Sequence, residues 1–290
     1  MNPERTGDVL VVVAPRGATD AADRHLLAAA AAWVLGVDPR TVSIERTCER
    51  CGGSHGRPVV AVPPGAAGPT PLAGPPHAAP PPPGPPPLAG PPHAGPPHAG
   101  PLHAGPLHAS LSRAADSVAI ALTFAGPVGI DIESVEAVSR ADFDQVAFGA
   151  SELSALRSVP PADASWARAV LWTAKEAVLK CTGAGLRVDP RGLTVTLPDA
   201  GDPDAGTESG TAAAPRLAAW PGAGFPLDTM RLARFDPGPG LAGTVAVRSD
   251  AGHSDAGHTE TGPRVLQLTH TDIRRRPGPR LSQSLGSAVR

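Results

Sequence analysis

The sequence contains no tyrosine, only 3% aromatic residues, and three cysteines, an odd number that does not suggest a framework of disulfide bonds. It has no run of about 18 apolar residues, the length that a membrane-spanning helix needs. The apolar segment at residues 9–14 is too short for the core of a signal peptide. A net charge of −2 argues against nucleic-acid binding through bulk electrostatics. We therefore expect a soluble cytoplasmic protein.

Proline and glycine are abundant, and residues 63–109 are built largely from them. Gly-Pro-Pro-His-Ala or Gly-Pro-Leu-His-Ala recurs there, at 74–78, 90–94, 95–99, 100–104 and 105–109. Such a segment buries too little apolar surface to offset the entropy of ordering it, which predicts a disordered insertion. Its histidines could bind a metal and its prolines a partner, or it could be an expansion without function in a tolerant loop. Residues 249–290 are predicted to be a disordered tail.

Hydrophobic periodicity predicts both helices and strands. Strands are expected at residues 8–15, 41–46, 116–124, 128–133, 192–197, 216–220, 229–235 and 242–248, and helices at residues 21–35, 142–148, 151–157 and 164–181. The elements form two halves of similar pattern that meet near Gly126. The first half takes residues 1–62 and 110–126, and the second takes residues 127–248. This pattern predicts the α+β class.

The predicted helix at 164–181 carries a polar stripe. Trp172, Glu176 and Lys180 are spaced four residues apart, which places them on one face of the helix. A carboxylate and an ammonium one turn apart could hold a cation and a phosphate side by side. The alternative is an exposed ion pair of the ordinary kind.

The predicted strand at 128–133 carries two carboxylates on one face. Side chains alternate along a strand, so Ile130 and Ile132 point one way and Asp131 and Glu133 the other. Two carboxylates at a strand end suit a hard divalent ion such as magnesium, which takes one or two protein carboxylates together with substrate phosphates. The alternative is a strand face that is simply solvated.

The two patterns together resemble the paired signature of the 4'-phosphopantetheinyl transferases: Gly129-x-Asp131-x-Glu133, followed by Trp172-x-x-Lys175-Glu176-Ala177-x-x-Lys180. The resemblance extends over about 21–62 and 110–247. It implies a pseudo-dimer of two similar α/β halves, with coenzyme A bound in the cleft between them. It also implies a Mg²⁺-dependent transfer of the phosphopantetheine arm of coenzyme A to a serine of an acyl or peptidyl carrier protein, as in secondary metabolite biosynthesis. A monomer is expected on the same basis.

The resemblance also assigns roles to residues. It implies that Asp131, Glu133 and Glu176 bind the metal, and that Glu176 and Lys180 are catalytic. It implies contacts to coenzyme A from Arg57, Ser112, Arg113 and Lys175. The chain departs from the family at one step, because Arg113 stands where many members have a histidine and Ala114 where they have a serine. Arginine still binds phosphate but cannot transfer a proton as histidine does.

Cys48-x-x-Cys51, followed by His55, has the spacing of a zinc site. A structural zinc normally has four ligands, and no obvious fourth follows nearby, although Cys181 on the predicted helix at 164–181 is a distant candidate. A turn that carries thiols is the alternative. Two other functions remain open: a non-catalytic protein that binds coenzyme A or a carrier, and a scaffold that recruits partners through residues 63–109. Manganese has ligand preferences similar to those of magnesium.

Overall fold

The hydrophobic segments of the chain form strands that assemble into two main sheets. The computed structural model describes residues 8–48, 51–54, 56–63, 105–140, 142–197, 214–249 and 263–275. Six strands form the first sheet, in the order β11-β1-β5-β4-β3-β2, three form the second, in the order β6-β10-β9, and β7 pairs with β8. No helix within these residues is long and apolar enough to span a membrane.

The first sheet is covered by one long helix. Its strands are β1 (Asp8–Pro15), β2 (Ser43–Glu45), β3 (Val59–Ala61), β4 (His108–Ala114), β5 (Ser117–Thr123) and β11 (Arg264–Thr269). Helix α1 (Asp20–Leu35) begins where the Thr19 side chain accepts a hydrogen bond from the Ala22 amide and ends at Gly36, which has φ of +67°. Its alanine- and leucine-rich face packs on Val12, Ile120 and Leu122 of the sheet.

The second sheet contains β6 (Val128–Ser134), β9 (Met230–Phe235) and β10 (Leu241–Arg248). Helix α4 (Ala164–Thr182) lies on its outer face. Gly129 makes a close approach possible, because a Cβ there would stand 2.0 Å from the carbonyl oxygen of Ala177. The short helices α2 (Phe143–Ala147) and α3 (Ala150–Ser158), with β7 (Thr194–Thr196) and β8 (Arg216–Ala219), close the far side of α4.

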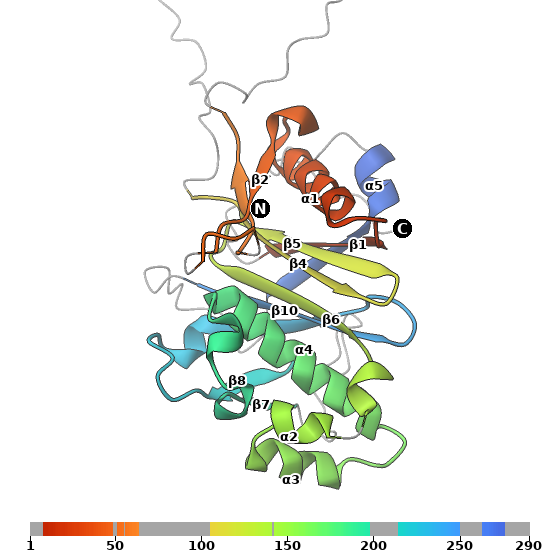
Figure 1. The fold of residues 1–290 in the computed structure, drawn as a ribbon, viewed down its shortest axis with the longest axis vertical. Helices are drawn as coiled ribbons and strands as arrows, with labels where there is room; N and C mark the ends of the chain where they lie inside the picture. Colours follow the sequence, from red (N-terminus) through yellow and green to blue (C-terminus); the bar gives the residue numbers. More distant parts are fainter. Residues whose placement is uncertain are drawn as a thin grey trace, which may run out of the picture.

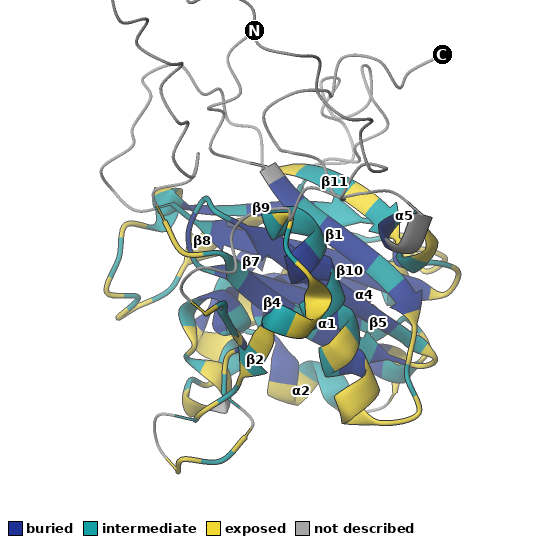
Figure 2. Cartoon of the chain, turned by 90° about the horizontal axis from the view of Figure 1, so that it is seen from above, coloured by how far each residue is buried: buried dark blue, intermediate teal, exposed yellow. Residues whose placement is uncertain are grey.

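The two sheets stack, and the helices lie outside them. In Figure 1, α1 lies above the first sheet and α4 below the second. Figure 2 shows the central strands β1, β5 and β10 largely buried, and the edge strand β11 and the outer side of α1 more exposed. Ile130 and Ile132 join Val11, Ala119 and Val245 in the core between the sheets. The opposite face of β6 therefore turns toward α4, and that face carries Asp131.

The α+β class is confirmed. The predicted strand at residues 8–15 is β1, and the helix predicted at 164–181 is α4, one residue longer. The similarity of the halves, and hence the pseudo-dimer, stays a prediction.

The prediction of a disordered tail is wrong for part of residues 249–290. β11 pairs in parallel with β1, from Asp8 with Arg264 to Val13 with Thr269, and α5 (His270–Arg275) follows it. Without β11, β1 would be an edge strand with a row of unpaired backbone groups. The alternation of apolar residues in β11 is weak and lies among polar residues, so periodicity alone does not predict this strand. The predicted insertion also ends early, because His108 and Ala109 belong to β4. Residues 64–104, most of the insertion, lie outside the described residues, as does His55.

Candidate functional site

Asp131 lies at the centre of the site, on β6 where it meets both α4 and β4. Its side chain is buried, and its Oδ1 accepts hydrogen bonds from Ser112 Oγ (2.7 Å) and Lys180 Nζ (2.5 Å). Lys180 also donates to Ser112 Oγ, at 2.9 Å. The second oxygen, Oδ2, is buried and has no hydrogen-bond partner within the described residues. Burial raises the pKa of Asp131, and the Lys180 ammonium acts in the opposite direction.

Glu133 and Glu176 add negative charge beside Asp131. Burial, and then the Asp131 charge, raise the pKa of Glu133 from 4.5 to about 7, while a hydrogen bond with the Trp172 side chain lowers it. Burial and Asp131 also raise the pKa of Glu176. Lys180 acts on both carboxyl groups in the opposite direction. The three carboxylates therefore repel one another in a partly buried place with a single ammonium among them.

The carboxylate oxygens of Asp131, Glu133 and Glu176 suit a hard cation, although the three side chains do not converge on one point. Among the described residues, no three His, Cys, Asp or Glu side chains are close enough to hold a metal ion together. The chemistry of the set fits Mg²⁺, because all the donors are carboxylate oxygens and Asp131 Oδ2 is a buried acceptor without a donor. Burial is the main cause of the raised pKa of all three carboxyl groups, and the charge of Asp131 adds to it for Glu133 and Glu176. A divalent cation would stabilise the ionised form of each group.

Helix α4 presents its polar stripe to this site. Trp172, Glu176 and Lys180 are half-buried, whereas the residues between them are buried. Trp172 is held edge-on against Phe143, with ring centroids 5.2 Å apart. The predicted stripe is thus a real face of the helix, and its lysine contacts Asp131 as described above.

Arg57 reaches the same helix from the first half. Its guanidinium donates to the carbonyl oxygens of Cys181 (2.6 Å) and Lys180 (3.3 Å) in the last turn of α4. The negative end of the helix dipole favours a cation there. Arg57 therefore contacts the backbone of α4 at Lys180, and its contact with coenzyme A stays a prediction.

Lys175 does not lie in the site, which corrects the expectation that it contacts coenzyme A. Its side chain has no exposed surface and forms an ion pair with Glu152, which is 1% exposed. Glu152 also accepts backbone hydrogen bonds from Gly149 and Val195, both at 2.9 Å. Lys175 is adjacent to Glu176 in sequence, but one residue rotates the helix by about 100°, so Lys175 points into the core. The pair could not be identified from sequence because Glu152 is 23 residues away on another helix.

Arg113 is also turned away from Asp131. Side chains alternate along β4, so Arg113 lies on the face opposite Ser112, and its Nε donates to Asp23 of α1 at 2.5 Å. Arg113 belongs instead to a group of cations on the first half. The pKa of Arg46 is lowered by burial and then by the charges of Arg113 and Arg24. Sequence reasoning missed Arg24 and Arg46 because they come from α1 and from the end of β2, and only the fold brings them together.

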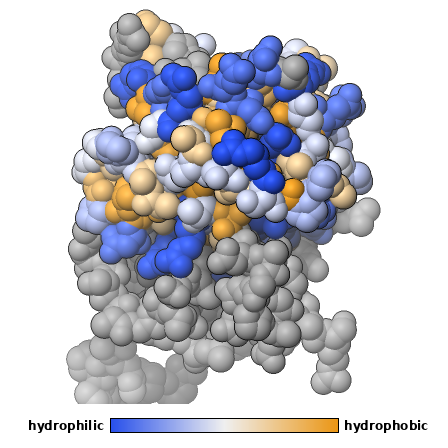
Figure 3. All heavy atoms as spheres, turned by 90° about the horizontal axis from the view of Figure 1, so that it is seen from below, coloured by the Kyte–Doolittle hydropathy of each residue, from blue (hydrophilic) through white to orange (hydrophobic). Residues whose placement is uncertain are grey.

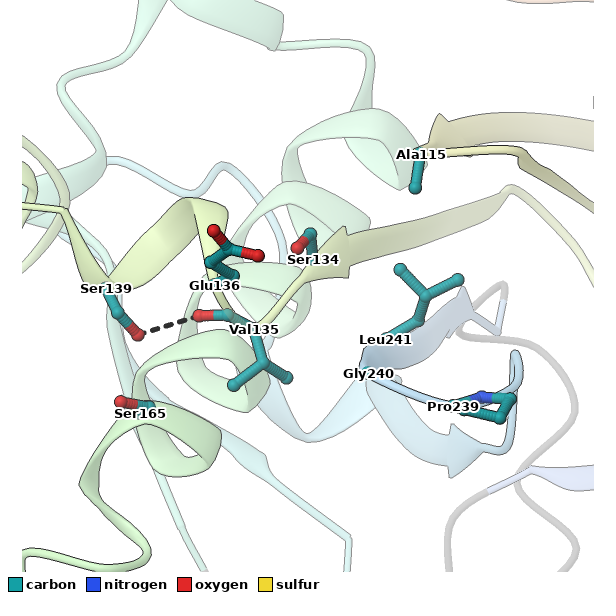
Figure 4. A pocket seen from close by; sticks show the side chains of 9 residues that line it. All are labelled: Ala115, Ser134, Val135, Glu136, Ser139, Ser165, Pro239, Gly240 and Leu241. Carbon is teal, nitrogen blue, oxygen red and sulfur yellow. Dashed lines mark hydrogen bonds between the residues drawn. The ribbon is translucent and has the colours of Figure 1, made fainter.

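A cavity of about 580 Å³ opens beyond the end of β6. Figure 4 shows its lining: Ala115 comes from the turn between β4 and β5, and the other residues come from the second half. Ser139 donates to the carbonyl oxygen of Val135 at its rim, at 2.7 Å. A second cavity, of about 410 Å³, shares Ser139 and Ser165 with the first and is lined by Arg140, Asp142, Asp144 and Arg168. Neither cavity is lined by the three carboxylates.

The surface near these cavities is mixed. Figure 3 views the molecule from below, the side on which α2 and α3 lie in Figure 1, and apolar residues there are interspersed with hydrophilic ones. Val146 and Trp166 are the exposed large apolar side chains of α2 and α4, and Arg234 stacks over the Trp166 ring at 5.7 Å.

Residues 127–226 match the model of the 4'-phosphopantetheinyl transferase superfamily. The matched segment begins next to β6 and contains Asp131, Glu133, Glu176 and Lys180. No curated protein matches the chain. The family resemblance is confirmed over this segment, which supports a phosphopantetheinyl transferase activity in general.

Proposed function

We propose that the protein transfers the 4'-phosphopantetheine arm of coenzyme A to a serine hydroxyl of an apo acyl or peptidyl carrier protein and releases 3',5'-ADP. The observation that carries the proposal is the contact of Asp131 with Lys180, both inside the segment that matches the superfamily, and of both residues with Ser112 of β4. Phosphoryl transfer to a hydroxyl needs groups that position the phosphate and neutralise its charge, and this site supplies both kinds.

Asp131, Glu133 and Glu176 would hold Mg²⁺, which supplies Lewis acidity and orients the diphosphate when it is bound. Asp131 Oδ2 is buried and has no hydrogen-bond partner among the described residues, so it is the carboxylate oxygen that would gain most from coordinating a cation. A metal-free pure binder of coenzyme A would gain nothing from three mutually repelling carboxylates. This supports a metal-dependent transferase over a non-catalytic binding protein.

Glu176 would take the proton of the carrier serine, directly or through water. Its raised pKa brings the carboxylate closer to the pH at which a general base both accepts and loses protons readily. Lys180 would stabilise or protonate the leaving phosphate. Its contact with Asp131 places an ammonium beside the acidic centre, and a cation there offsets negative charge that develops on a phosphate oxygen.

Coenzyme A would lie between the halves, against Arg57 and Ser112. Arg57 is on the loop before β3 and contacts the end of α4, so it spans the two halves. Arg113, with Arg24 and Arg46, would meet a phosphate of the same ligand on the first half, since guanidinium groups bind phosphate in a bidentate manner.

A pseudo-dimeric monomer in the cytoplasm accords with this proposal. Each half begins with a strand, β1 or β6, and each covers its sheet with one long helix, α1 or α4. The carrier would come from a synthase of secondary metabolism, and residues 63–109 would take no part in the reaction.

The test is to incubate the protein with coenzyme A, Mg²⁺ and a panel of apo carrier proteins, and to weigh the carriers by intact mass spectrometry. We expect one carrier to gain the mass of the phosphopantetheine arm, only when metal is present. Glu176→Gln and Asp131→Ala should each lower the rate at least ~100-fold, the usual scale for one acid-base or electrostatic group. Glu45→Gln, an exposed carboxylate on β2, is the matched control and should not change it.

Near-normal turnover in Glu176→Gln or Asp131→Ala would remove the assignment of that residue. Binding of coenzyme A by calorimetry without transfer to any carrier would favour a non-catalytic binding protein. The replacement of the family histidine by Arg113 would then be the first cause to examine.

A further inference from the structure

The Arg57 guanidinium is held against the end of α4. Its Nη2 is the atom that donates to the carbonyl oxygens of Lys180 and Cys181. Gly183, which ends the helix with φ of +72°, leaves room for this contact, since a Cβ at Gly183 would stand 3.0 Å from Nη2 of Arg57. A guanidinium also carries N–H groups on Nε and Nη1, and these suit the oxygens of a phosphate.

The backbone directly before Arg57 is fixed at Gly56 by two contacts. The Arg46 Nε donates to the carbonyl oxygen of Gly56 at 2.8 Å. Gly56 also lies so close to Thr47 that a Cβ would stand 2.1 Å from the Thr47 carbonyl oxygen, and only glycine allows this approach. The carbonyl group of Gly56 belongs to the planar peptide unit that includes the nitrogen and Cα of Arg57. The hydrogen bond from Arg46 therefore sets the orientation of the peptide from which the Arg57 side chain starts.

Arg46 is well placed to hold this peptide. It directly follows β2, so its own backbone is anchored to the first sheet. Its side chain is half-buried, and it donates to the Gly56 carbonyl from a charged group. A hydrogen bond from a charged donor is stronger than one between neutral groups, and its loss leaves a partly buried carbonyl without that donor.

We propose that Arg46 is a positioning residue for coenzyme A binding, which holds the Gly56–Arg57 peptide in the orientation from which the Arg57 side chain reaches both α4 and a phosphate. This inference rests on the proposed function, in which Arg57 contacts coenzyme A. Arg46 acts through Arg57, and it does so with the N–H group on Nε rather than with its charge.

A direct contact with a phosphate is the competing role for Arg46. The charges of Arg113 and Arg24 act on Arg46, so all three belong to the cationic group of the first half. The two roles use different properties of the side chain, because positioning needs a donor at Nε and attraction of a phosphate needs the positive charge. If Arg46 is committed to Gly56, a phosphate on the first half would be met by Arg24 and Arg113.

Three substitutions at position 46 separate the donor from the charge. The side-chain amide nitrogen of glutamine is the same number of bonds from the backbone as Nε of arginine, so Arg46→Gln retains an N–H donor there and removes the charge. Arg46→Lys retains the charge but places a methylene where Nε was, with its ammonium beyond it. Arg46→Met has neither the donor nor the charge.

Hydrogen exchange of the full-length protein without ligand tests the contact itself. The amides of Cys48 and Gly52 donate to the carbonyl oxygens of Gly53 and Cys48, both at 2.8 Å, so their exchange reports on the backbone between β2 and β3. We expect several-fold faster exchange in peptides from this connection for Arg46→Met and Arg46→Lys, and nearly unchanged exchange for Arg46→Gln. Equal exchange in all four proteins would overturn the proposal.

Calorimetry and steady-state kinetics with coenzyme A test the consequence for binding. Arg46→Met and Arg46→Lys should raise the Kd and the KM several-fold with little change in kcat, and Arg46→Gln should retain the affinity of the unsubstituted protein. In an Arg57→Ala background, Arg46→Met should have no further effect, because no arginine is left to position. Arg40→Met is the matched control, since the Arg40 side chain is 91% exposed and pairs with Asp38, and it should change none of these values.

The opposite ranking, with affinity kept in Arg46→Lys and lost in Arg46→Gln, would overturn the positioning role and assign Arg46 to a phosphate through its charge. Additive effects of Arg46→Met and Arg57→Ala would also overturn it, because the two side chains would then act independently. Failure of the unsubstituted protein to bind coenzyme A would refute the proposed function. Hydrogen exchange would still decide whether Arg46 fixes the backbone before Arg57, so the two failures are distinguishable.

Discussion

Replacing Lys175 by methionine should destabilise the protein strongly and leave its affinity for coenzyme A unchanged. The Lys175 ammonium is fully buried beside the Glu152 carboxylate and lies 5.4 Å from the centre of the Phe148 ring. Methionine fills a similar volume, so the substitution removes the charge and creates only a small cavity. The buried carboxylate of Glu152 then has no counter-ion, although it still accepts from the Gly149 and Val195 amides.

The loss of stability in Lys175→Met is set by the Glu152 carboxylate that remains buried without its counter-ion. Breaking a buried ion pair by removing one partner costs about 3–5 kcal/mol, because the remaining charge is uncompensated. The two backbone donors keep the cost near the lower end, so we expect about 3 kcal/mol for Lys175→Met. Adding Glu152→Gln removes the charge but leaves one buried backbone N–H facing the glutamine NH2 group, which cannot accept a hydrogen bond, at about 1–3 kcal/mol. The double variant should therefore be more stable than Lys175→Met alone.

Urea denaturation measures these differences as changes in the free energy of unfolding. Arg168→Met is the control, because its pair with Asp144 is partly exposed, at 28% and 33%, and surface pairs contribute about 0–1 kcal/mol. Steady-state kinetics below the unfolding transition should give an unchanged KM for coenzyme A. A double variant less stable than Lys175→Met would refute the reasoning about the buried ion pair. A raised KM for coenzyme A in Lys175→Met would indicate that Lys175 contributes to coenzyme A binding after all.

Three further outcomes are expected. Because burial raises the pKa of Glu133 from 4.5 to about 7, ionisation of this group opposes folding, so its contribution to stability is present below about pH 4.5 and is lost as the pH rises through 7. Urea denaturation should show Glu133→Gln gaining stability relative to the unsubstituted protein from pH 5 to pH 8, and Mg²⁺ should diminish this gain at pH 8; a difference independent of pH would argue against it. Gly129→Ala should cost about 1–3 kcal/mol in the same assay, because the new Cβ meets the carbonyl oxygen of Ala177, and an unchanged midpoint would contradict the close packing of α4. Arg57→Ala should raise the KM for coenzyme A about tenfold or more, as expected for loss of a charged hydrogen bond, and Arg57→Lys should recover part of it; equal KM values in all three proteins would exclude a phosphate contact.

The sequence alone determined the class of fold and which polar side chains share one face of β6 and one face of α4. Alternation placed Asp131 and Glu133 on one face of a strand, and helical spacing placed Trp172, Glu176 and Lys180 on one face of α4. Both patterns are local, because they depend only on the period of the backbone. The structure confirms both elements and adds that the two faces meet through the contact of Lys180 with Asp131.

Local periodicity could not show what each side chain meets across the fold. Lys175 is part of the same motif as Glu176, yet the rotation of one residue sends it into the core toward Glu152. Arg113 is adjacent to Ser112, yet the alternation of β4 turns it toward Asp23. Both patterns were visible in the sequence, but the partners that make one face a site and the other a core belong to elements far away in the chain.

The tertiary structure also decided where weak local signals became ordered structure. The alternation in β11 is short and lies among polar residues, and it forms a strand because the open edge of β1 offers it backbone partners. Arg24, Arg46 and Arg113 are dispersed over 90 residues of sequence and become one cationic group only when α1, β2 and β4 pack together. The interaction between two charges depends on their distance in space and not along the chain. The grouping of these three arginines was therefore decided by the fold.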